Sequence, residues 1–378
     1  MNGIFQTYDV FYNVYALFLI SIVIMLIPLF YYTDMENRYG KTYDNILCAY
    51  IIIGATALFG LRGWDIGTDT AAYLTMFAKM ETVSHLPTAL SKSSPVQVRD
   101  IGFSTLLFYA TRFMSPRAFI VLIAFLFVFP LYLAVNRVAT INKAFMLFGF
   151  VCFFNFTSLG VNVIRQGISL AFIILSFTYT QKGGIKNILL FLILAILGIS
   201  FHLSGIIIVV MFLITKIVRA NFLYYVILAI TFILAYMDLG LINLPVIGPL
   251  IELDDRVDAY ASGLGSQPPS GLQMSKLVFH GAIILWSSYN LNILNNKFYL
   301  HIYRLFIALT AFYFLCLNMS FSDRFGVMSW LLSPILVGYP LVNYKNIVKY
   351  SSLFLMGQYL IFMLYSFYVY ILARPYVK

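Results

Sequence analysis

Residues 118–135, AFIVLIAFLFVFPLYLAV, form an apolar run without a single charged side chain. An α-helix needs about 20 apolar residues to cross the hydrocarbon core of a bilayer, so a run of this kind predicts a membrane span. Similar runs recur along the 378-residue chain, of which 62% is hydrophobic and only 10% charged. The strand-like alternation of an outer-membrane barrel does not occur in the sequence. The sequence therefore predicts an all-α, polytopic membrane bundle, whose helices satisfy their own backbone hydrogen bonds.

Thirteen apolar runs predict about 11 to 13 transmembrane segments. They lie near residues 10–32, 45–61, 102–114, 118–135, 144–160, 163–180, 187–201, 204–218, 222–243, 276–294, 302–319, 327–342 and 351–372. The first run is long for a signal-peptide core and lacks a small-residue cleavage site, so we expect it to be retained. The two longer loops, 62–101 and 245–275, are too short for independent domains. We therefore expect one integral-membrane domain over residues 1–378.

The distribution of lysine and arginine predicts the topology. Arg38 and Lys41 follow the first run, which places that loop in the cytoplasm and both longer loops outside. Alternate short loops carry further cytoplasmic charges, namely Lys182, Lys186, Lys216, Arg219, Lys297, Lys345 and Lys349. The run at 102–114 conflicts with this count because it is short and contains an arginine. Either this run is re-entrant or interfacial, or Arg137 and Lys143 are exceptions to the charge rule.

Each longer loop contains a candidate short helix. Tyr73, Met76, Phe77 and Met80 follow the spacing i, i+3, i+4, i+7. This spacing predicts an amphipathic helix that lies on the bundle or in the head-group region. In the loop 245–275, prolines and glycines bracket an acidic stretch, which predicts a short helix on a flexible tether.

Arginines stand beside short polar motifs where apolar runs end. The clearest cases are Arg62, Arg165 and Arg324, which the predicted topology places on the outer side. Permanently charged, bidentate guanidinium groups suit a diphosphate, so we interpret these three as candidate pyrophosphate ligands. The alternative is that each arginine anchors a helix end among the lipid head groups.

Other polar residues are candidates for acid–base chemistry or sugar binding. Asp69 precedes the predicted amphipathic helix, so it is either a helix N-cap or a carboxylate that deprotonates a sugar hydroxyl. His202, within GISFHLSG, is either a structural residue or a general base. The most polar patch of the second longer loop either is solvated or recognises sugar, and it contains Asp255, Arg256 and Tyr260.

The remaining composition argues against several other kinds of site. Cys48, Cys152 and Cys316 all lie within apolar runs, so we expect neither a disulfide framework nor a metal cluster. The net charge of +10 is spread over loops between spans. This distribution fits anionic lipid head groups better than nucleic acid. Because arginines can neutralise a leaving group, we expect no metal or other cofactor to be required.

Five motifs, taken in order, resemble the pattern of the EpsG/Wzy-type bacterial polysaccharide polymerases. They are LRGWDIGTDTAAYLTMF, RDIGF, NVIRQGISLAF, GISFHLSGIII and SDRFG, and they cover most of the chain. One departure is Asp100, where that family more usually has a glutamate before the Gly-Phe. The matched positions are Arg62, Gly67, Asp69, Tyr73, Arg165, His202 and Arg324. Among these, we expect Tyr73 to contact the glycan.

The resemblance implies a GT-C-like glycosyltransferase of the bacterial inner membrane whose active site faces the periplasm. Its donor and acceptor would be undecaprenyl-pyrophosphate-linked oligosaccharides. The growing glycan would pass to the non-reducing end of the incoming repeat unit, and a chain-length regulator protein is a further expected partner. Arg165 and Arg324, helped by Arg62, would hold the pyrophosphate, while His202 or Asp69 activates the acceptor hydroxyl.

Three alternative functions stay open at this point. One is a metal-dependent GT-C transferase that adds single sugars from a polyprenyl-phosphate donor. Another is a transporter of lipid-linked oligosaccharides, which would need ionisable residues deep in the bundle. Here such residues gather near one face, which favours surface chemistry over transport. The third is a membrane O-acyltransferase, which one histidine among several arginines fits only loosely.

Overall fold

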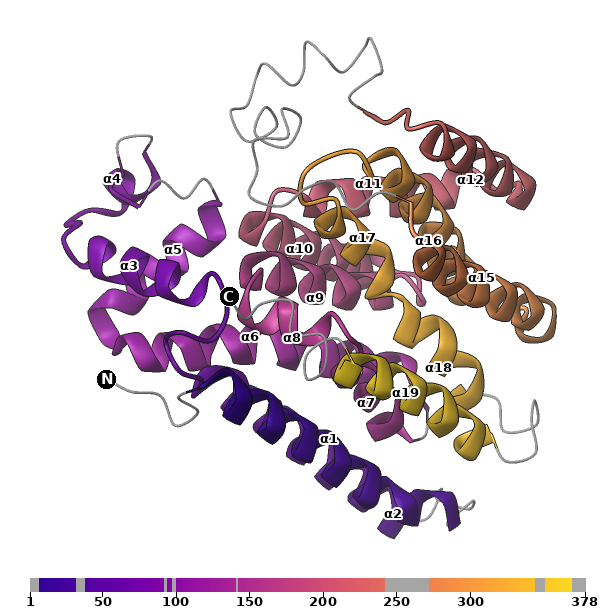
Figure 1. Cartoon of the computed structure of the whole chain (residues 1–378), viewed down its shortest axis with the longest axis horizontal. Coiled ribbons are helices and arrows are strands. Elements are labelled where there is room, and N and C mark those ends of the chain that lie inside the picture. The colour runs from indigo at the N-terminus through magenta and orange to yellow at the C-terminus, as the bar shows by residue number, and fades with distance from the viewer. Residues whose placement is uncertain are drawn as a thin grey trace. The chain divides into compact units, whose positions relative to one another are not determined.

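The structure is a computed structural model that describes residues 7–31, 38–91, 94–96, 100–140, 142–241, 272–343 and 351–368. Within these ranges the regular structure is helical and no strand occurs (Figure 1). The described part contains 6 helices that are long and apolar enough to cross a membrane, together with shorter apolar helices. The chain is therefore a polytopic helical membrane protein, and the predicted fold class is confirmed.

The chain divides into two compact units. The first unit comprises Met1–Ile206 and Leu341–Lys378, and the second comprises Ile207–Pro340. Helices of the first unit are α1 (Tyr8–Tyr31), α2 (Arg38–Gly60), α3 (Thr70–Glu81), α4 (Leu86–Leu90), α5 (Ile101–Phe113), α6 (Pro116–Val138), α7 (Lys143–Val151), α8 (Phe156–Val161), α9 (Ile164–Tyr179), α10 (Ile185–Phe201) and α19 (Ser351–Phe367). Helices of the second unit are α12 (Asn221–Tyr236), α15 (Met274–Leu294), α16 (Lys297–Leu315) and α17 (Asp323–Trp330). Two further helices cross the division along the chain, α11 (Gly205–Ile217) and α18 (Ser333–Asn343).

Most predicted apolar runs form one helix each, but two are broken. The run at 144–160 separates into α7 and α8, and the run at 327–342 lies across α17 and α18. At the first break, the Tyr15 hydroxyl donates to the Val151 carbonyl at 2.5 Å, and the Ser366 hydroxyl donates to the Cys152 carbonyl at 2.7 Å. Side chains from α1 and α19 thus replace backbone hydrogen bonds that the break removes, which makes it tolerable inside an apolar bundle.

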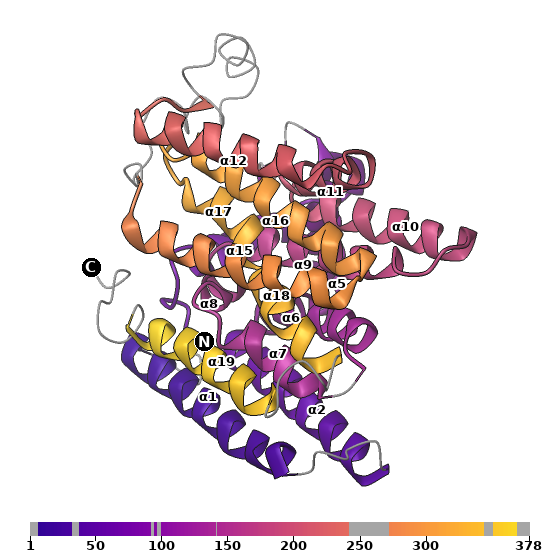
Figure 2. The same cartoon turned by 90° about the vertical axis from the view of Figure 1, so that its right-hand side faces the viewer.

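The C-terminal helix α19 returns to the N-terminal part of the first unit. It packs beside α1 and α7, as Figure 2 shows. Gly149 of α7 makes this approach possible, because a Cβ atom there would lie 2.3 Å from Cζ of the Tyr359 ring. A side chain of α2 fixes the start of α7. The Asp44 carboxylate accepts from Lys143 N at 3.0 Å and from Ala144 N at 2.9 Å. A buried carboxylate on a neighbouring helix therefore serves as the N-terminal cap.

Helices α9 and α10 lie side by side (Figure 1). Two glycines, Gly198 in α10 and Gly205 at the start of α11, lie close to α9. A Cβ atom at Gly198 would lie 2.7 Å from Ile173 Cγ1 and 2.9 Å from the Ser169 carbonyl oxygen. A Cβ atom at Gly205 would lie 2.7 Å from the Ser169 hydroxyl. Small residues at the contact let the backbones of membrane helices approach, and here they place the end of α10 against the first half of α9.

The predicted amphipathic helix is confirmed as α3. Tyr73, Phe77 and Met80 are buried on one face, which packs against α5 rather than standing free. The rings of Tyr73 and Phe103 lie 5.7 Å apart, and those of Phe77 and Phe119 lie 5.6 Å apart. The loop that contains α3 is therefore held against the helices of the first unit by aromatic contacts.

Helix α5 corresponds to the run whose topology conflicted with the charge rule. Its 13 residues rise about 20 Å, well short of the roughly 30 Å hydrocarbon core. It is also not among the helices long enough to cross a membrane. This length agrees with the re-entrant or interfacial alternative for α5. Since α11 has the same 13 residues, the topology of this part of the chain stays a prediction.

The second unit is organised around α16, which packs against α12, α15 and α17. His280 of α15 stands between aromatic rings of α16 and α17, and its Nε2 accepts from Trp330 Nε1 at 3.0 Å. Lys276 of the same helix forms an ion pair with Asp323 at 3.2 Å. These polar contacts join α15 directly to α17, beside the central helix.

Alanine at Gly198 should lower the melting temperature of the purified protein, because the added Cβ would press on the backbone of α9. Overpacking of this kind costs about 1–3 kcal/mol. The matched control is Gly281→Ala in α15, where a Cβ atom would meet nothing within 4 Å. That variant should be as stable as the parent or slightly more stable, because alanine favours helix over glycine. Equal melting temperatures for the two variants would contradict the close approach of α9 and α10.

Candidate active site

Arg165 lies in the first turn of α9 and interacts with two polar side chains. Its Nη1 donates to Oδ2 of Asp100, the residue before α5, and its guanidinium also interacts with the Tyr73 hydroxyl of α3. The Asp100 side chain is 3% exposed, whereas that of Arg165 is 23% exposed. A buried carboxylate thus holds one side of the guanidinium, while another part remains accessible. We call Tyr73, Asp100 and Arg165 the arginine cluster.

Asn162 joins the loop before α3 to the start of α9. Its side-chain oxygen accepts from Thr68 N at 2.8 Å, and its backbone carbonyl accepts from the Tyr73 hydroxyl at 3.2 Å. Gly67, with φ of +89°, lies against the same segment, and a Cβ atom there would be 2.3 Å from Val161 Cγ1 and 2.6 Å from Asn162 Oδ1. Only glycine suits both the left-handed backbone and the lack of space. The motifs around Arg62 and Arg165 therefore meet directly.

Arg62 is fully buried rather than directed at an open site. It donates through Nε to the Thr70 hydroxyl at 3.1 Å, and through its other nitrogens to the carbonyls of Phe59 and Val161. Burial lowers the pKa of the Arg62 guanidinium to about 10, so it stays protonated at neutral pH. This geometry supports a role in holding the loop after α2 and disfavours the predicted direct contact with pyrophosphate.

Arg117 of α6 also contacts the loop after α2. Arg117 Nη1 donates to the Arg62 carbonyl at 2.6 Å, and its guanidinium stacks 3.6 Å from the centre of the Trp64 ring. A cation over a tryptophan face adds an attractive contact. The sequence segment that contains the acidic candidate Asp69 is therefore held from α2, α6 and the start of α9.

Tyr73 is only 2% exposed. Burial raises the pKa of its phenol, and the neighbouring Arg165 acts in the opposite direction. The neutral hydroxyl donates to Asn162, and the ring packs on Phe103. In this position Tyr73 orients Arg165, and the burial of its side chain disfavours the predicted contact with the glycan.

Asp69 occupies the N-cap position of α3, but its side chain makes no capping hydrogen bond. Its Oδ1 accepts from the Thr68 hydroxyl at 3.1 Å, and the residue is partly exposed. One of the two alternatives for this residue, a side-chain cap, is thus not realised in the structure. A partly exposed carboxylate one turn from Tyr73 is placed to accept a proton from a bound hydroxyl group.

His202 ends α10 in an extended conformation. Its Nδ1 accepts from Ser204 N at 3.3 Å and lies 2.6 Å from the Ser204 hydroxyl. A backbone N–H can only donate, so Nδ1 is the acceptor and the proton of the neutral ring is on Nε2. The residue therefore presents an N–H donor at Nε2, which suits binding of an oxygen better than proton abstraction.

The end of α10 and the arginine cluster are brought together through α5 and α9. A Cβ atom at Gly102, two residues after Asp100, would lie 2.2 Å from the Ser200 hydroxyl. The Ser169 hydroxyl, one turn beyond Arg165 on α9, donates to the His202 carbonyl at 3.4 Å. His202 therefore contacts α9 one turn beyond Arg165, whereas Asp69 lies one turn before Tyr73, the other partner of that arginine.

Arg324 belongs to the second unit and opens α17. Its guanidinium lies 4.6 Å from the centre of the Phe321 ring. The adjacent Asp323 forms its ion pair with Lys276 and also accepts from the Tyr313 hydroxyl at 3.4 Å. The remaining predicted residues of the second longer loop, Asp255, Arg256 and Tyr260, lie outside the described residues.

Asn162 and the pairing of Asp100 with Arg165 are the features that sequence reasoning missed. Asn162 is the first residue of the NVIRQG motif, and a polar side chain between two apolar helices is the signal that could have marked it. Asp100 stands directly before an apolar run in the same way. Among the described residues, no group of three or more histidine, cysteine, aspartate and glutamate side chains could hold a metal ion.

The model of the EpsG family matches residues 45–377, which is most of the chain and includes residues of both units. No curated protein and no solved structure matches the chain significantly.

Alanine at Asn162 should loosen the loop before α3, because the Thr68 N–H would lose its acceptor in a part-buried setting. Loss of one such hydrogen bond costs about 0.5–1.5 kcal/mol. Limited proteolysis of the purified protein should then cleave within 63–69 several times faster than in the parent. The control is Asn187→Ala, which removes only an exposed side-chain contact with the Gly183 carbonyl. Equal cleavage rates in all three proteins would contradict the structural role of Asn162.

Proposed function

This chain belongs to the EpsG family of polysaccharide polymerase-like membrane proteins, and on that premise we propose that it polymerises lipid-linked oligosaccharide repeat units. The donor and the acceptor are both carried by undecaprenyl pyrophosphate in the bacterial inner membrane, and the reaction takes place on the periplasmic side. The observation that carries the proposal is the environment of Arg165, whose partly accessible side chain is held by the buried carboxylate of Asp100 at the start of α9.

Arg165 is the proposed ligand of the donor pyrophosphate. Its contact with Asp100 uses one of five N–H groups, and a guanidinium can pair with a phosphate through two of the others. The positive end of α9 adds to the local potential. Because the side chain is oriented before the substrate arrives, its charge is in place when negative charge develops on the leaving group.

The proposed reaction is the displacement of undecaprenyl pyrophosphate by a sugar hydroxyl. The acceptor oxygen forms a bond to the anomeric carbon of the donor glycan, and the bond from that carbon to the pyrophosphate oxygen breaks. The electron pair of the broken bond leaves with the pyrophosphate. Asp69 takes the hydroxyl proton, and the Nε2–H of His202 donates to an oxygen of the substrate.

The other predicted residues take different parts in this proposal. Arg62 and Tyr73 are positioning residues, because the first holds the loop that carries Asp69 and the second orients Arg165. Arg324, which belongs to the second unit, stays a sequence-based prediction. With arginines as counter-charges, the mechanism includes no metal ion. A chain-length regulator protein stays a proposed partner.

Replacement of Arg165 by alanine should slow polymerisation by about 100-fold or more, the usual effect of removing a donor that stabilises developing charge. Lysine should restore part of the rate, because it keeps the charge but not the bidentate geometry. The measurement uses purified protein in nanodiscs with undecaprenyl-pyrophosphate-linked repeat units, and follows products on a gel.

The control for loss of a cation is Lys79→Ala, since Lys79 is exposed on the outer face of α3. Thermal unfolding of each variant shows whether the protein is intact. In cells, loss of the glycan ladder with retention of a single repeat unit supports polymerisation. Loss of that unit as well would instead indicate export or an earlier step of synthesis. A full ladder formed by Arg165→Ala at the parent's rate would refute the proposal.

Asparagine at Asp69 should reduce the turnover number by about 10²–10⁴-fold and leave the KM for the acceptor nearly unchanged, because the base acts in the transition state. Asp65→Asn is a suitable control, because Asp65 is an exposed carboxylate of the same loop. If both variants keep the parent's turnover number, Asp69 is not the base.

A further inference from the structure

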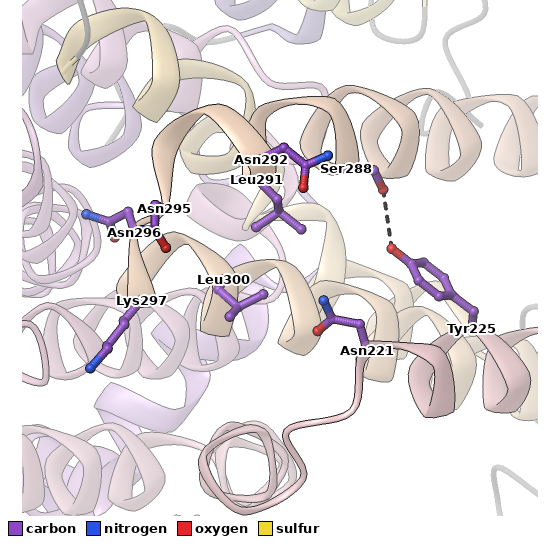
Figure 3. Close-up of a pocket in the computed structure, with 9 residues that line it drawn as sticks. All are labelled: Asn221, Tyr225, Ser288, Leu291, Asn292, Asn295, Asn296, Lys297 and Leu300. Atoms are coloured by element: carbon purple, nitrogen blue, oxygen red, sulfur yellow. Dashed lines mark hydrogen bonds between the residues drawn. The ribbon is translucent and has the colours of Figure 1, made fainter.

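The second unit contains a pocket of about 360 Å³ at the ends of three helices (Figure 3). Tyr225 comes from α12, Ser288 and Asn292 come from the last turns of α15, and Lys297 begins α16. The Tyr225 and Ser288 hydroxyls lie 3.4 Å apart on one wall. The proposed polymerase reaction does not use this pocket, whose lining is polar and rich in asparagine.

The asparagine side chains give the pocket an excess of hydrogen-bond donors. The Asn221 side-chain oxygen accepts from Arg304 Nε at 2.8 Å, and the Asn296 side-chain oxygen accepts from Tyr299 N at 3.0 Å. Since both oxygens are engaged in the fold, both side chains offer their amide N–H₂ groups to a ligand. Lys297 adds an ammonium donor. The pocket is therefore suited to a ligand that is rich in acceptors.

The electrostatic setting favours an anion. No carboxylate occurs among the described residues that line the pocket, whereas Lys297 is an exposed cation at its rim. Buried Arg304 stands directly behind Asn221 and polarises that amide. Phosphate oxygens are strong acceptors and carry charge, so a phosphate group fits both properties of the lining.

The surroundings of the pocket indicate that the phosphate belongs to a lipid. Leu291 and Leu300 line the pocket itself. Large apolar side chains continue from it along the outer faces of α12 and α15, where Phe222 is 63% exposed, Val226 46% and Ile293 46%. A polar hollow at helix ends beside an apolar surface matches a head group with its acyl chains.

We propose that this pocket binds the phosphate of an anionic lipid head group in the cytoplasmic leaflet. The predicted topology assigns the leaflet, because Lys216, Arg219 and Lys297 lie at the same helix ends and follow the positive-inside rule. The site is independent of the proposed polymerase reaction. Its ligand class is a glycerophospholipid with a net negative charge.

The test compares lipid retention by native mass spectrometry after the full-length protein is extracted from bilayers of phosphatidylglycerol and phosphatidylcholine. The parent should retain phosphatidylglycerol in preference to phosphatidylcholine. The double variant Asn292→Ala/Lys297→Gln should lose about tenfold in retention, the scale expected for a charge-assisted contact. Both residues are exposed, so we expect the variant to fold like the parent.

The matched control is Lys182→Gln, which removes an exposed lysine on the same predicted side of the membrane. It should retain phosphatidylglycerol like the parent. Glycerol 3-phosphate is then added as a soluble probe. If the probe displaces the lipid only at high excess, the ligand is a lipid. If the probe alone binds tightly, the ligand is a soluble phosphate, and the lipid assignment is overturned. Equal retention by parent, double variant and control would overturn the site itself.

Discussion

The ion pair between Arg165 and Asp100 is the interaction on which the first unit's site depends. A guanidinium at the start of an apolar helix is costly unless a partner compensates its charge. Asp100 does so from a position that is nearly closed to solvent, and Tyr73 adds a second contact. The pairing also constrains the fold, because it requires the starts of α5 and α9 to lie together. The same pair of side chains thus stabilises the fold and orients the proposed pyrophosphate ligand.

The helical content and most helix positions could be predicted from the sequence, since long apolar runs have few solutions in a bilayer. The amphipathic spacing of Tyr73, Phe77 and Met80 likewise identified α3. The break between α7 and α8 could not be predicted, because apolar residues continue through it. It depends on hydroxyl groups of α1 and α19, which lie far away in sequence. Hydropathy indicates whether a segment lies in lipid or in water, but it does not identify hydrogen-bond donors that are distant in sequence.

The site was predicted in part for a related reason. Polar residues at the ends of apolar runs identified Arg165, which the structure pairs with Asp100 and Tyr73. The roles of Asp69 and His202 stay predictions. The same pattern selected Arg62, whose partners are backbone carbonyls inside the protein. A sequence motif shows that a charge is present at a helix end but not the direction of its side chain. Arg62 is fully buried, whereas the side chain of Arg165 is partly exposed. This difference depends on the fold and cannot be read from the motifs.

The contact between Thr68 and Asn162 has a consequence for biosynthesis. It joins residues that are 94 positions apart, and the ion pair of Asp100 joins positions 65 apart. The ribosome must therefore release α6, α7 and α8 before the loop that carries Asp69 finds its acceptor. Until Asn162 has been translated, the loop before α3 lacks the acceptor of its Thr68 N–H. The order of synthesis makes the polar site of the first unit one of the later parts of that unit to form.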